Sequence, residues 1–155
     1  MENKTLKHLI QKPNEHNCII YSMAMLLNTS VEDLELRLGN LGNQKIWPTL
    51  PMPYCYRSYH IQEIIFVAYQ LGYAMICFYK NIYLSPTPPY TGTQIPIIVP
   101  RAHILKLLRG SRALLITERH AMAWNIDQVY DPNGNKFPLD NIYDSLIMFF
   151  LIKSI

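Results

Sequence analysis

The stretch of residues 116–135, ITERHAMAWNIDQVYDPNGN, constrains the fold most, because it predicts paired strands with a histidine at one end and an aspartate at the other. Residues 112–117 and 120–126 are rich in β-branched and apolar side chains and predict two strands. A tight turn then leads to a short third strand, which the turn sequence DPNG ends. His120 and Asp131 therefore occupy neighbouring strand ends, where their side chains can touch.

A histidine held by a carboxylate needs a group to deprotonate, and Cys18 is the candidate. It lies in residues 14–27, NEHNCIIYSMAMLL, where Asn17 is the expected helix N-cap and Cys18 begins the first turn. The free backbone N–H groups and the positive dipole end of a helix favour an anion there, and so a thiolate. The segment is apolar nearly all round, which predicts a helix buried in the domain. Cys18, His120 and Asp131 thus follow one another as nucleophile, base and orienter.

Each of these three residues also has a structural interpretation. Cysteine is among the most buried residue types, so Cys18 alone is most simply a small core residue. His120 alone is equally well explained as a hydrogen-bonded core histidine, and Asp131 alone as a turn residue before proline. Their order in the chain, together with the surrounding elements, favours the catalytic interpretation.

The composition indicates a globular chain that leans apolar, since 50% of its 155 residues are hydrophobic and 16% are charged. This length predicts one domain spanning residues 1–155. The apolar run 146–152 is shorter than the roughly 20 residues that cross a bilayer. The N-terminal sequence MENKTLKHLIQKPNE lacks the apolar core of a signal peptide. We therefore expect a cytoplasmic protein without a membrane partner.

Charge and cysteine content argue against several other classes. The net charge is +3 and the basic residues are scattered, whereas nucleic-acid binding calls for a basic stripe, so we expect no nucleic-acid partner. Three cysteines without a CxxC spacing indicate free thiols in a reducing compartment. A site built from His16, Cys55 and His60 matches no common zinc spacing. We predict neither a metal nor another cofactor.

The rest of the chain predicts helices first and a sheet last, which is an α+β architecture in two lobes. A capping box at Ser30 begins a helix that Gly39 ends, and a further helix covers residues 60–71. Proline-rich segments 40–59 and 80–100 predict loops that wall a groove between the lobes. The other predicted elements are a strand over 73–79, an edge strand over 95–99, a helix over 102–109 and an interior strand over 145–153.

Four further residues have simple expected places. His8 and His103 are expected on the surface, because nothing in their surroundings indicates a site. Cys77 lies within the predicted strand 73–79 and is expected to be a small buried apolar residue. Trp124 follows the proposed base closely and is expected to pack in the core, with a place in the groove wall as the alternative.

Three segments, residues 11–39, 60–73 and 110–134, resemble the papain-like cysteine peptidase superfamily. Within it, they are most similar to the compact branch of peptidase domains that cleave double-glycine leaders from bacteriocin precursors. The resemblance implies a papain-like α+β fold. Its N-terminal helical lobe carries Cys18 on a buried central helix, and its C-terminal antiparallel sheet carries the histidine and the aspartate.

The resemblance also implies an oxyanion hole, formed by the backbone N–H of Cys18 and a glutamine side chain. Such peptidases commonly have this glutamine six residues before the cysteine, a position that is Lys12 here, with Gln11 one residue further back. Gln11 is therefore the expected donor. The small residue, often glycine, that usually follows the cysteine is replaced by Ile19.

The expected function is acyl transfer by a cysteine hydrolase that cleaves a peptide or isopeptide bond of a protein or peptide substrate. Deamidation and transglutamination are variants that the same triad supports. The alternative is a papain-fold binding module of low or no activity, such as an effector or phage-type protein that sequesters a protein partner. Ile19 and the shifted glutamine motivate this alternative.

Overall fold

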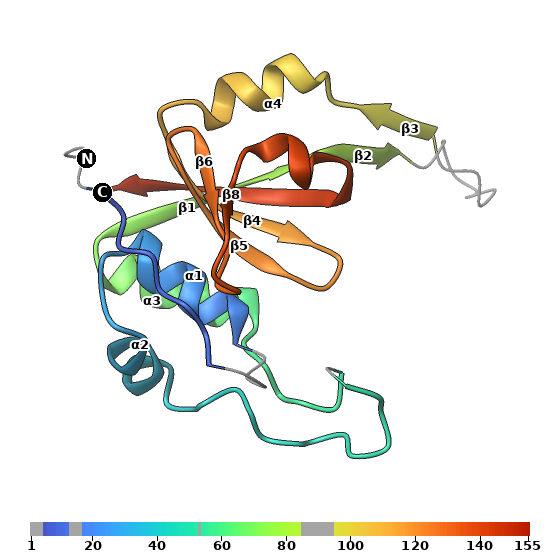
Figure 1. Cartoon of the computed structure of the whole chain (residues 1–155). Helices are drawn as coiled ribbons and strands as arrows, with labels where there is room; N and C mark the ends of the chain where they lie inside the picture. Colours follow the sequence, from blue (N-terminus) through green and yellow to red (C-terminus); the bar gives the residue numbers. More distant parts are fainter. Residues whose placement is uncertain (1–4, 13–16, 53, 85–94) are drawn as a thin grey trace.

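The computed structural model describes residues 5–12, 17–52, 54–84 and 95–155 (Figure 1). Within these ranges the chain is α+β, with four α-helices, a six-stranded antiparallel sheet and a separate two-stranded sheet. The helices are α1 (Cys18–Leu26), α2 (Val31–Leu38), α3 (Ile61–Gln70) and α4 (Arg101–Leu108). The strands are β1 (Tyr73–Tyr79), β2 (Asn81–Leu84), β3 (Ile95–Ile98), β4 (Arg112–Thr117), β5 (Ala121–Asn125), β6 (Gln128–Tyr130), β7 (Lys136–Phe137) and β8 (Leu146–Ser154).

The predicted helix ends are set by side-chain caps in two of the first three helices. The Ser30 hydroxyl accepts a hydrogen bond from the Asp33 backbone N–H at 3.0 Å, and Gly39 ends α2 in the left-handed conformation. At α3, the Glu63 carboxylate accepts from the His60 backbone N–H at 2.9 Å, which closes a capping box. Asn17 stands at the N-cap of α1 as predicted, but its side chain makes no capping bond.

The six-stranded sheet has the order β1-β8-β4-β5-β6-β7, and each neighbouring pair is antiparallel. The apolar strand β8 lies between β1 and β4, which confirms the interior place predicted for it. Tight connections join β4 to β5 and β5 to β6, so the segment with the histidine and the aspartate forms one end of the meander.

Alternate residues of the central strands point into two different cores. On one face Leu114, Ala123 and Phe150 pack beneath α1, α2 and α3. On the other face Leu115 and Trp124, with others, pack against α4. Figure 1 shows the same division, with α1, α2 and α3 on one side of the sheet and α4 on the other. The helix that begins with Cys18 thus packs against the strand that follows His120.

Two sequence predictions differ from the structure. Cys77 is exposed, not buried, because β1 is an edge strand of the six-stranded sheet and its second half is poorly covered. The segment 80–100 is not simply a loop, since β2 pairs with β3 from Asn81 opposite Ile98. The prolines 86, 88 and 89 of that segment lie outside the described residues.

The helices of the described ranges are short, the longest having 10 residues. None of them is long and apolar enough to cross a bilayer.

Candidate active site

His120 and Asp131 meet at one end of the β5–β6 pair. The register sets Ala123 opposite Tyr130, so the residues just before β5 and just after β6 come to the same edge of the sheet. The Nε2 atom of His120 lies 2.7 Å from Oδ1 of Asp131. The contact expected from the sequence is therefore present, and it uses one defined ring nitrogen.

The turn that follows Asp131 fixes its carboxylate. Oδ1 also accepts a hydrogen bond from the backbone N–H of Asn133 at 2.8 Å, and the backbone N–H of Asp131 donates to the Asn135 carbonyl at 2.9 Å. Burial raises the pKa of Asp131, but the hydrogen bonds from His120 and Asn133 outweigh it, and the pKa is lowered overall. The carboxylate is thus ionised and oriented at neutral pH.

Cys18 is the first residue of α1 and is half-buried next to His120. Burial by itself lowers the pKa of His120, yet hydrogen bonds with Asp131 and Cys18, and the negative charges of the same two groups, raise it to about 9. Because Nε2 is bound to Asp131, the other ring nitrogen, Nδ1, is the one left for the thiol. The raised pKa favours the protonated imidazolium form of His120 beside the Asp131 carboxylate.

The N-terminal segment, residues 5–12, runs along the turn after Asp131 and carries Gln11 to it. The backbone N–H of Gln11 donates to the Pro132 carbonyl at 2.8 Å, and its side-chain Nε2 donates to Oδ1 of Asn133 at 2.6 Å. The Oε1 atom is buried and has no hydrogen-bond partner among the described residues. The bond to Asn133 was not foreseen from the sequence.

His8, which was expected on the surface, lies in the same segment, is half-buried and contacts the Asp131 turn. Its Nε2 is 2.6 Å from the backbone carbonyl of Asp131, and its ring meets Tyr130 edge to face. A positive charge on His8 contributes to lowering the pKa of Asp131, after the larger effects named above. No local pattern in the sequence signals this contact, because the two residues are 123 positions apart. His103 is exposed, as predicted.

Trp124 packs in the core on the far face of the sheet from α1, as the sequence favoured. Its indole N–H donates to the Leu108 carbonyl at 2.8 Å, which ties β5 to the end of α4. The tryptophan therefore does not wall a groove at His120.

The remaining polar candidates are dispersed. Cys55 is buried in the 40–59 loop, and His60 is the N-cap residue of α3. No group of three or more His, Cys, Asp or Glu side chains within the described residues is arranged to hold a metal ion. His16, which the sequence had suggested as a third member, lies outside the described residues.

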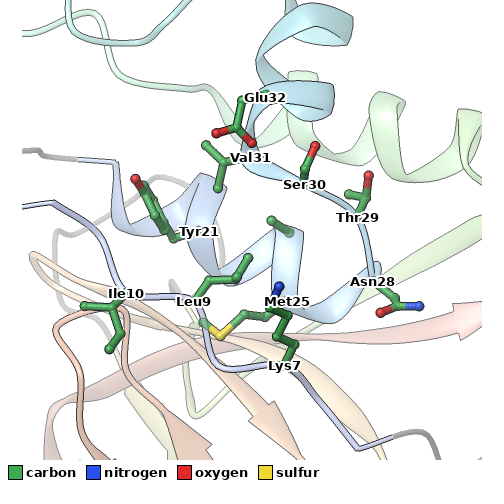
Figure 2. Close-up of a pocket in the computed structure, with 11 residues that line it drawn as sticks. Lys7, Leu9, Ile10, Tyr21, Met25, Asn28, Thr29, Ser30, Val31 and Glu32 are labelled. Carbon is green, nitrogen blue, oxygen red and sulfur yellow. The ribbon is translucent and has the colours of Figure 1, made fainter.

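A cavity of about 490 Å³ lies between the N-terminal segment, α1 and the start of α2 (Figure 2). Tyr21 and Met25 line it from α1, one and two turns beyond Cys18. The other lining residues are Lys7, Leu9, Ile10, Ala24, Asn28, Thr29, Ser30, Val31 and Glu32. The predicted groove between two lobes involves loops of which residues 53 and 85–94 lie outside the described residues.

Comparison with known proteins adds a structural relative. No protein-family model matches the sequence, and no curated protein matches it. Among solved structures, the chain is similar to a double-glycine motif protease from an AMS/PCAT transporter, determined in complex with the leader peptide. The match covers 97% of this chain and 93% of that chain, with 12% sequence identity and a TM-score of 0.59. The chain therefore shares the fold of a double-glycine motif protease, which is consistent with the papain-like α+β architecture that its sequence resembles.

Proposed function

We propose that the chain is a cysteine peptidase in which Cys18 is the nucleophile, His120 the general acid and base, and Asp131 the orienting carboxylate. The observation that carries the proposal is the 2.7 Å bond between His120 Nε2 and Asp131, beside a cysteine at the N-terminus of a buried helix. The fold shared with a solved protease supports it.

The proposed reaction follows from these positions. The Cys18 thiolate attacks the carbonyl carbon of the scissile peptide bond, and the His120 imidazolium gives its proton to the leaving amine nitrogen. A thioester between Cys18 and the acyl part remains. Water then attacks this thioester and His120 takes up one water proton, so that the thiolate–imidazolium pair is restored and a carboxylic acid leaves, which releases its remaining proton to solvent as it ionises. Asp131 keeps Nε2 occupied, so that Nδ1 faces the sulfur in every step.

The proposed substrate is a peptide segment of a protein. The solved relative was determined with a leader peptide bound, and peptides with two consecutive glycines before the scissile bond are therefore the first to assay on this chain. The assay incubates the purified chain with a peptide panel and reads the products by mass spectrometry. Cleavage at one fixed bond, lost in Cys18→Ala, would support the proposal. Cleavage that persists unchanged in that variant would contradict it.

Gln11 is proposed as the side-chain donor of the oxyanion hole, together with the backbone N–H of Cys18. Its Nε2 carries two hydrogens, and the bond to Asn133 uses one and fixes the plane of the amide. The second hydrogen stays available to an oxyanion.

Substitution of Gln11 by glutamate is expected to lower kcat roughly a hundred- to a thousandfold, the usual loss for one oxyanion donor. Glutamate keeps the size of the side chain and can accept a hydrogen bond from the Asn133 amide once that amide turns, but it offers no N–H to the oxyanion. Lys12→Ala, at an exposed neighbouring position, is the matched control and should leave kcat unchanged. Steady-state kinetics on a cleaved peptide measure both, and wild-type kcat in Gln11→Glu would remove Gln11 from the oxyanion hole.

Peptide cleavage is expected to fall as the pH rises through about 9, because the pKa of His120 is raised to about 9 and the imidazolium that protonates the leaving amine is then lost. Alkylation of Cys18 requires only the thiolate and should not fall in that range. The raised pKa of His120 also makes the stability of the fold depend on pH. The pKa of His120 in the folded chain exceeds its unfolded value of about 6.5, so its contribution to the free energy of unfolding is full below pH ~6.5 and is lost as the pH rises through about 9. A decline of kcat/KM centred near pH ~6.5 would contradict this assignment.

A second function, a binding module without turnover, is favoured by two observations. The Gln11 amide is already hydrogen-bonded to Asn133, and Ile19 follows the cysteine where a small residue is usual. Under this alternative, a captured protein partner would remain intact and would bind Cys18→Ala as tightly as the wild type. Hydrolysis that depends on Cys18 would exclude it.

A further inference from the structure

We propose that Ser22 is a positioning residue that sets the helix carrying Cys18 against the strand that directly follows His120. This inference rests on the proposed peptidase function, since it concerns the distance between the proposed nucleophile and its base. Ser22 is fully buried in α1, and its hydroxyl donates a hydrogen bond to the backbone carbonyl of Ala121 at 3.1 Å. Ala121 is the residue directly after His120.

Cys18 and Ser22 make successive contacts from α1 to His120 and to Ala121, the first residue of β5. Residues four apart in a helix lie on the same face, so Cys18 and Ser22 both face the beginning of β5. Cys18 interacts with His120, and one turn later Ser22 bonds to the next residue of the strand. A serine within a helix often bonds to the carbonyl four residues before it. Here the hydroxyl reaches across to the sheet instead.

The carbonyl of Ala121 needs this donor. The carbonyl of His120 points to β4, where the Thr117 backbone N–H donates to it at 2.9 Å, so the carbonyl of the next residue points the other way, toward β6. The β5–β6 register, extended from Ala123 opposite Tyr130, sets Pro132 opposite Ala121. Proline has no N–H to offer. Ser22 therefore supplies the bond that the sheet lacks at this position.

The Ser22 hydroxyl gives this end of α1 a directional bond to the sheet. Its buried neighbours Ile20, Met23 and Ala24 make apolar contacts, which are not directional. The other end of the helix is held separately, where Nη1 of Arg112 donates to the Leu26 carbonyl at 3.3 Å. Loss of the Ser22 hydroxyl should therefore loosen the end that carries the thiol and leave the far end in place.

The test is the rate at which iodoacetamide alkylates Cys18 between pH 5 and 9, read by mass spectrometry on the full chain. In Ser22→Ala, labelling near pH 6 is expected to fall on the order of tenfold, because a thiol moved away from His120 loses stabilisation of its thiolate, and the thiolate fraction falls about tenfold for each unit by which the pKa rises. The profile should also move toward that of an ordinary thiol, which ionises near pH ~8.5. Ser22→Thr and Ser22→Val form a matched pair, equal in shape and different in the hydroxyl, and only the threonine variant should keep the faster labelling.

If Ser22 has only a structural role, Ser22→Ala should lower the melting temperature without shifting the pH profile of Cys18 alkylation. Trp124→Phe is the control for that case, because it removes another buried side-chain bond to a backbone carbonyl, on the opposite face of the sheet. Wild-type labelling in Ser22→Ala, or equal labelling of the threonine and valine variants, would overturn the positioning role alone. If the wild type itself labels only like an ordinary thiol, the proposed peptidase function fails first, and the positioning role with it.

Discussion

Replacement of Cys18 by alanine is expected to lower peptide cleavage on the order of 10⁶-fold, the scale of loss when the nucleophile of a catalytic triad is removed. In the proposed mechanism the thiol of Cys18 forms the acyl intermediate, and Cys18 is the cysteine that acts on the pKa of His120, whereas Cys55 and Cys77 do not. The substitution removes one half-buried sulfur at the N-terminus of α1, so the fold should be retained. Kinetics on a cleaved peptide and a thermal melt measure the two effects.

Cys77→Ala is the matched control, because it removes an exposed thiol far along the chain from the proposed site. It should cleave like the wild type. Equal losses in both variants would show that a general effect of thiol removal, and not nucleophilic attack by Cys18, accounts for the change.

Asp131→Asn is expected to cut activity by roughly 10⁴-fold while leaving the fold nearly intact. An asparagine oxygen still accepts from the backbone N–H of Asn133, so the turn keeps its internal bond. The imidazole of His120, however, loses the charged partner that fixes its tautomer and helps to raise its pKa. The decline of cleavage at alkaline pH should accordingly move to lower pH.

Asp127→Asn makes the same chemical change on an exposed residue of the β5–β6 turn and serves as the control. It should leave both kcat and the pH profile unchanged. Full activity in Asp131→Asn would mean that Asp131 only shapes the turn.

The part of the site that the sequence predicted is the part with local signals. His120 and Asp131 are 11 residues apart, and strand alternation with a strong turn sequence is enough to bring their ends together. The start of α1 at Cys18 followed from a capping position and an apolar segment. The pairing of Cys18 with His120, across about a hundred residues, was predicted from the chemistry of the three residues and their order in the chain, and the family resemblance supported it.

The parts that were missed depend on contacts without periodicity. The N-terminal segment reaches the Asp131 turn through His8 and Gln11, whose partners lie more than 120 residues away, and irregular chain gives no pattern from which to read such a contact. The exposure of Cys77 is a matter of strand order, because an apolar strand reads the same at the edge of a sheet as in its middle. Ser22 carries no sequence signal either, since its role follows from a carbonyl opposite Pro132.

The most direct test of the central claim is the reactivity of Cys18 toward iodoacetamide at pH ~6, with Cys77 as internal reference and His120→Ala as comparison. An ordinary thiol is almost wholly protonated at that pH, since it ionises near pH ~8.5. A thiolate–imidazolium pair predicts that Cys18 labels much faster than Cys77 and that the advantage disappears in His120→Ala. Labelling of Cys18 no faster than Cys77, or unchanged by loss of His120, would contradict the proposed active site.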